Sequence, residues 1–125
     1  MDTPRPASAL QFLVLDTLQD LAGSPEALGT MLRTIQESMA DDLAQLQKSS
    51  LAQDAKAVGL KLHSIKGYMP LLCQPALAER LFNLEALFSE PAQLAPSQWP
   101  TQAINALLAD LGTLLQELQV AVKRG

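Results

Sequence analysis

Cysteine, aromatic residues and histidine are all scarce in this chain. Cys73 is the single cysteine among 125 residues, so no internal disulfide can form, as is typical of proteins from a reducing compartment. Aromatic residues account for 4% of the chain and hydrophobic residues for 48%, which predicts an aliphatic core built mainly from Leu and Ala. His63 is the only histidine, so metal sites that need paired histidine ligands are excluded and we expect no bound metal.

Positive charge and long apolar runs are lacking as well. The formal net charge is −4 and the pI is about 4.8, so no basic stripe is available for nucleic acid. No apolar run approaches the roughly 18 residues that a membrane helix requires. The first residues lack the basic start and apolar segment of a secretory signal. We therefore expect a cytoplasmic protein that binds neither nucleic acid nor membrane.

Five stretches carry apolar residues at helical spacing. They predict helices over 8–22, from Pro25 after an N-cap at Ser24, from Asp54 or the alternative cap Ser50, from Pro75, and after Pro100. The fold class that follows is all-α, an antiparallel four-helix bundle with an additional short N-terminal helix, in a single domain over 8–123. The Pro-rich segment 1–7 is expected to be mobile. The predicted core comprises Leu28, Leu32, Ile35, Met39, Leu43, Leu46, Leu77, Leu81, Leu84, Phe88, Ile104, Leu107, Leu111, Leu114, Leu118 and Val122.

The stripe of apolar residues around His63 predicts that this side chain is exposed. Its members are spaced by four and three residues in alternation, and they are Leu51, Ala55, Val58, Leu62, Ile65, Met69 and Leu72. At about 100° per residue, the middle of the stripe lies roughly 130° from His63. The imidazole should therefore face away from the core and be available for chemistry.

The neighbours of His63 on its own helix face favour phosphoryl chemistry. Gly59 and Gly67 lie one turn away on either side and leave space around the ring, at a cost of about 1 kcal/mol each in helix propensity. Lys66, and Lys56 as a second candidate cation, can reach the space above the ring. A neutral ring nitrogen beside cations suits attack on a phosphoryl group. The alternative is a surface histidine that falls between two glycines by chance.

The string His63-Ser64-Ile65-Lys66-Gly67 resembles the His-x-x-Lys-Gly signature of histidine-containing phosphotransfer (HPt) domains. Three further segments resemble family patterns, and together they cover roughly residues 10 to 122. They are Gly23-Ser24-Pro25-Glu26-Ala27-Leu28, Gln53-Asp54-Ala55, and the pair Pro75-Ala76-Leu77-Ala78 with Leu84-Glu85.

The resemblance implies a phosphocarrier of a two-component phosphorelay, without enzymatic turnover of its own. Nε2 of His63 would accept a phosphoryl group from the aspartyl phosphate of a response-regulator receiver domain and pass it to another receiver. Lys66 would contact the phosphoryl group or the receiver. The chain would be a monomer that binds no cofactor, with Mg²⁺ supplied by the receiver, and a hybrid histidine kinase is a further candidate partner.

HPt domains dock receivers through an apolar surface near the histidine, and Phe12, Leu15 and Leu60 are the candidates for that surface here. Helix angles equally allow Phe12 and Leu15 simply to cover the end of the bundle. The sequence departs from the family after Gly67, where Tyr68-Met69-Pro70 replaces small residues. Pro70 should end or kink the helix nearby, which leaves the orientation of Lys66 open.

That departure supports one alternative function, an HPt-like adaptor that binds a receiver or kinase but accepts no phosphate. A second alternative is an unrelated helical interaction module.

Four other features are interpreted as structural and are given no role in phosphotransfer. Asp41 and Asp42 are placed on a solvated helix face, Cys73 in the core, and Trp99 in a loop packed against the bundle, while Tyr68 faces away from His63.

Overall fold

The structure, a computed structural model, describes residues 10–90 and 94–124, so the predicted mobile segment 1–7 lies outside the described residues. Within them the chain is all-helical apart from short links, as predicted. The α-helices are α1 (Asp16–Ala22), α2 (Pro25–Leu51), α3 (Ala55–Lys66), α4 (Pro75–Leu87) and α5 (Thr101–Arg124). In the described parts of the links lie two 3₁₀ turns, η1 (Met69–Leu71) and η3 (Pro96–Gln98).

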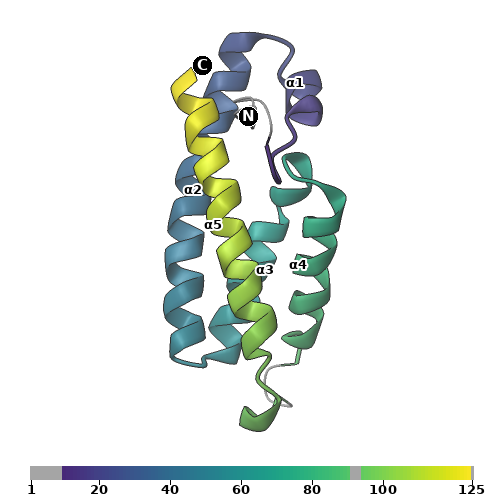
Figure 1. Cartoon of the computed structure of the whole chain (residues 1–125), viewed down its shortest axis with the longest axis vertical. Coiled ribbons are helices and arrows are strands. Elements are labelled where there is room, and N and C mark those ends of the chain that lie inside the picture. The colour runs from purple at the N-terminus through teal and green to yellow at the C-terminus, as the bar shows by residue number, and fades with distance from the viewer. Residues whose placement is uncertain (1–9, 91–93, 125) are drawn as a thin grey trace, which may run out of the picture.

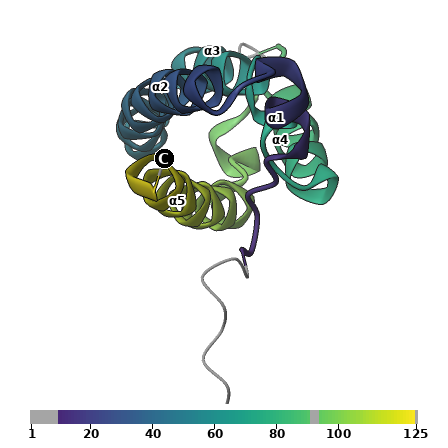
Figure 2. The same ribbon diagram turned by 90° about the horizontal axis from the view of Figure 1, so that it is seen from above.

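Helices α2 to α5 surround a common centre, with α1 near one end (Figure 2). Successive helices from α2 onward run in opposite directions, and α5 returns to the end where α2 began (Figure 1). Among the described elements, α2 makes its largest interfaces with α3 and α5. Helix α3 is therefore held between α2 and α4, each of which supplies a carboxylate to the region around His63. No helix within 10–90 or 94–124 is both long and apolar enough to cross a membrane.

The helix starts follow the local capping signals. Ser24 Oγ accepts a hydrogen bond from the Ala27 N–H at 3.1 Å, and Asp54 Oδ1 accepts one from the Ala57 N–H at 3.2 Å. Both side chains satisfy an amide that the first helical turn leaves unpaired. The alternative cap at Ser50 is not used, because α2 continues through it. Helix α3 ends before Pro70, as that proline predicts.

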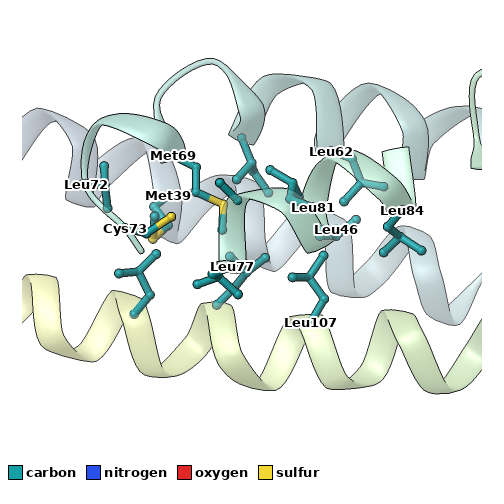
Figure 3. Packing of buried hydrophobic residues seen from close by; sticks show 14 of the residues in the cluster. Met39, Leu46, Leu62, Met69, Leu72, Cys73, Leu77, Leu81, Leu84 and Leu107 are labelled. Carbon is teal, nitrogen blue, oxygen red and sulfur yellow. The ribbon is translucent and has the colours of Figure 1, made fainter. Parts of the chain in front are cut away.

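The predicted apolar stripes form the core. Side chains from α2, α3, α4, α5 and the link before α4 converge between the helices (Figure 3). Cys73 is buried there, as predicted. Trp99 and Phe88 pack in a T-shaped arrangement with 5.3 Å between the ring centroids, so the loop tryptophan covers the core as expected. Leu51 was wrongly placed in the core: it is the last residue of α2 and is 82% exposed.

The first helix begins later than predicted. Residues 8 and 9 lie outside the described part of the chain, and 10–15 form a non-helical strap that precedes α1. The Val14 N–H donates to the Leu72 carbonyl at 2.8 Å, and the Gln74 N–H donates to the Phe12 carbonyl at 3.0 Å. The strap therefore pairs with the link before α4, and these hydrogen bonds take the place of those that a helix would have formed.

A single carboxylate completes the strap. Glu117 on α5 accepts hydrogen bonds from the backbone N–H groups of Gln11, Phe12 and Leu13, at 2.6, 3.0 and 2.9 Å. Three amides that a helix would have satisfied internally are satisfied across the molecule instead. The strap is thus fixed to both α5 and the start of α4, across the end of the helices.

Candidate functional site

His63 lies near the end of α3 with its side chain 72% exposed. Val58, Leu62 and Ile65 on the same helix are fully buried. The helix therefore turns its apolar stripe inward and presents the imidazole to solvent. The predicted orientation of the only histidine is confirmed.

Glu85 on α4 is the closest polar partner of the imidazole. Its Oε2 lies 2.9 Å from Nδ1 of His63, and the Glu85 side chain is 19% exposed. An ionised carboxylate can only accept hydrogen bonds, so Nδ1 must carry the proton that forms this contact. When the ring is neutral, Nε2 is then the nitrogen with the free lone pair. The contact thus selects which ring nitrogen can act as a nucleophile.

Lys66 reaches the same carboxylate from one turn further along α3. Its Nζ lies 3.0 Å from Oε1 of Glu85 and 5.5 Å from the centroid of the Phe82 ring. His63 and Lys66 therefore occupy the two oxygens of one carboxylate, and the end of the helix before Pro70 leaves Lys66 on the side of the imidazole. The structure answers the question that the sequence left open about its orientation.

Lys66 and the imidazole keep Glu85 ionised. Burial raises the pKa of the Glu85 carboxyl, but hydrogen bonds from Lys66 and His63 and their nearby charges outweigh that effect. The pKa consequently lies below the ordinary value of 4.5. At neutral pH the carboxylate is an acceptor for Nδ1 and a counter-charge for Lys66.

The two glycines beside His63 have different surroundings. A Cβ on Gly67 would meet only the Ser64 carbonyl of its own turn, at 3.2 Å, so this position is otherwise open. A Cβ on Gly59 would lie 3.1 Å from the carbonyl oxygen of Phe88 and 3.2 Å from its Cβ. Gly59 therefore permits close packing of α3 against the end of α4, which differs from the access role predicted for it.

The other residues predicted to contact a partner differ in their exposure and in their distance from His63. Leu60 is 62% exposed and lies one turn from His63, so it remains available to a partner. Phe12 and Leu15 are partly buried and pack against the core, which favours the interpretation that they cover the end of the helices. Lys56 is exposed, but seven residues of helix place it about 10 Å from His63 along the axis.

A groove lies beside the site. It is lined by Gly59, Lys66, Phe82, Glu85, Ala86, Phe88 and Ser89.

Asp42 was placed wrongly on a solvated face. It is 7% exposed and accepts hydrogen bonds from Ser64 Oγ at 3.1 Å and Tyr68 OH at 3.0 Å, while Lys61 Nζ lies 3.5 Å away. The signal was present in the sequence, because Asp42 lies three residues after one core residue of α2 and four before another. Tyr68 does face away from His63, as predicted, but it has a buried partner there.

Groups able to hold a metal ion are absent from the described residues, where no three His, Cys, Asp or Glu side chains gather. Comparison with known proteins gives no further guide, since no protein-family model, curated protein or solved structure matches the chain.

Proposed function

We propose that this chain is a histidine phosphotransfer protein of a two-component phosphorelay, with His63 as the phosphoacceptor. The observation that carries the proposal is the shared carboxylate: Glu85 holds Nδ1 of an exposed imidazole while it also pairs with Lys66. The arrangement gives one nucleophilic nitrogen, a fixed ring and an adjacent cation. The antiparallel course of α2 to α5, with α1 at one end, fits the four-helix bundle of the HPt family.

The proposed transfer step makes use of that geometry. The lone pair of Nε2 attacks the phosphorus of a receiver's aspartyl phosphate in line, forming a P–N bond while the bond from phosphorus to the aspartyl oxygen breaks. The aspartate leaves as a carboxylate, and the ring keeps its proton on Nδ1. Glu85, ionised and 2.9 Å from Nδ1, offsets the positive charge that develops on the ring.

The second transfer is the reverse reaction on another receiver. The aspartate of that receiver attacks the phosphorus, the P–N bond breaks, and the electron pair returns to Nε2. Mg²⁺ held by the receiver would offset the charge of the phosphoryl oxygens. This chain is accordingly a phosphocarrier without turnover of its own, working as a cytoplasmic monomer with receiver domains or a hybrid kinase as partners.

Exposed residues on both helices support a docking surface around His63. Leu60 on α3 and Phe82 on α4 are partly or largely exposed apolar side chains. Helix α3 carries no acidic residue and places Lys66 beside His63, although the whole chain has a net charge of −4. A surface of this kind is complementary to the acidic phosphorylation site of a receiver.

Incubation with a phosphorylated receiver and Mg²⁺, read by intact mass, tests the proposal. We expect this chain to gain one phosphoryl group as the receiver loses its own. A phosphorylation-silent adaptor would bind the receiver and keep its mass, and an unrelated helical module would do neither. Either of those results would overturn the proposed function.

A further inference from the structure

Asp42 is the one charged side chain that is buried within the described residues. It belongs to α2 and lies at the interface with α3, away from the Glu85 contact on α4. A buried carboxylate is expensive unless it is paired and hydrogen-bonded, and apolar residues of similar size are often no less stable. Its presence in the core stripe therefore points to a role other than stability.

The partners of Asp42 bracket His63 in the sequence. Lys61 Nζ lies 3.5 Å from Oδ1, while Ser64 Oγ and Tyr68 OH donate to Oδ2 at 3.1 and 3.0 Å. Lys61 precedes His63, Ser64 follows it directly, and Tyr68 comes after the end of α3. One carboxylate on α2 thus holds the segment of α3 that carries the imidazole and the turn that follows.

The Tyr68 hydroxyl is a dependable donor in this network. Burial raises the pKa of Tyr68 well above its ordinary value, and the charge of Asp42 and the hydrogen bond to it add to the effect. The phenol therefore stays protonated at physiological pH. It anchors the chain to α2 immediately before the 3₁₀ turn that contains Pro70.

We propose that Asp42 is a positioning residue for His63, fixing the rotation of α3 from the α2 side so that Nδ1 meets Glu85 on the α4 side. The two carboxylates then hold opposite sides of the same helical turns. A fixed ring directs Nε2 outward. That orientation serves a function only if His63 accepts a phosphoryl group, so this inference rests on the proposed phosphotransfer. The arrangement itself is tested without any transfer reaction.

Nitrogen-15 NMR of the imidazole provides the readout, since the chain has only one histidine. The spectra are recorded above the usual titration range of imidazole, where the ring is neutral and the shifts of Nδ1 and Nε2 report which nitrogen is protonated. In the parent, we expect the Nδ1–H form to predominate. Glu85→Ala should abolish that preference and serves as the reference for a lost contact.

Two substitutions of Asp42 separate positioning from stability. Asp42→Asn keeps an oxygen acceptor for Ser64 and Tyr68, so the Nδ1–H form should persist. Asp42→Leu removes the acceptor, and the ratio of Nδ1–H to Nε2–H should fall by up to about fivefold, the factor for one hydrogen bond of about 1 kcal/mol. Tyr68→Phe, which removes a single donor, should give a smaller change in the same direction and remains informative if Asp42→Leu does not fold.

An unchanged tautomer ratio in folded Asp42→Leu, or in Tyr68→Phe if Asp42→Leu does not fold, would overturn the positioning role and leave Asp42 as a purely structural residue. A changed ratio in Asp42→Asn equal to that in Asp42→Leu would also contradict it, because the acceptor would then be irrelevant. A parent that shows the expected tautomer but gains no phosphoryl group would refute phosphotransfer while leaving the positioning of the ring intact.

Discussion

Gly59→Ala should destabilise the protein although it improves helix propensity. The substitution gains about 1 kcal/mol in propensity. It also places a Cβ 3.1 Å from the Phe88 carbonyl oxygen and 3.2 Å from the Phe88 Cβ. Phe88 is 2% exposed and packs against Trp99, so the end of α4 cannot move away from α3 without disturbing the core. Overpacking of this kind costs about 1 to 3 kcal/mol, which leaves a net loss of up to about 2 kcal/mol.

Thermal melts followed by circular dichroism measure the effect, with Gly67→Ala as the matched control. Gly67 has ordinary helical geometry, with φ −64° and ψ −28°, and open space beyond its own turn. We expect Gly67→Ala to melt at or above the parent temperature and Gly59→Ala to melt lower, by up to about 8 °C at roughly 4 °C per kcal/mol. A Gly59→Ala protein that melts above the parent would refute the packing argument.

Four further predictions follow from the site. Lys66→Ala should slow single-turnover transfer by the equivalent of one charge-assisted hydrogen bond, about 1.5 to 3 kcal/mol; a loss in Lys56→Ala instead would move that role to Lys56. Gly67→Gln should keep the fold but slow transfer, because its side chain leans over the imidazole. The pKa of Glu85 is lowered in the folded protein, so its ion pairs stabilise the fold fully above pH 4.5, the ordinary pKa. This stabilisation is lost as the pH falls through the lower pKa of the folded state. Acid titrations of stability should therefore be flatter for Glu85→Gln. The absorbance of Tyr68, the only tyrosine, should show no phenolate at pH 10.0 while the protein is folded, and a phenolate signal there would contradict its buried hydrogen bond.

Local sequence signals predicted the helices that begin at caps and carry a single apolar stripe. Ser24 and Asp54 cap α2 and α3 as expected, and the stripe of α3 placed His63 on the exposed side. Capping and helical periodicity act within a few residues, so they are readable from one segment at a time. The same holds for Pro70, which ends α3 through its own missing amide.

Contacts between distant segments could not be read in this way. The strap at 10–15 has the apolar content of a helix, but its amides are satisfied by Glu117, about a hundred residues later. Glu85 is 22 residues from His63 and meets it only because α3 and α4 pack side by side. The burial of Asp42 could have been predicted, because the residue lies on the core stripe of α2. A buried carboxylate is normally hydrogen-bonded, so partners could have been expected as well.

The central claim is that His63 alone accepts a phosphoryl group, and mapping the adduct tests it most directly. After incubation with a phosphorylated receiver and Mg²⁺, the adduct should be labile in acid, stable in base and located on His63 by fragmentation. His63→Gln, shown to be folded by circular dichroism, should gain no phosphoryl group. An adduct that persists in His63→Gln, or one that is stable in acid and maps to a hydroxyl side chain, would contradict the account.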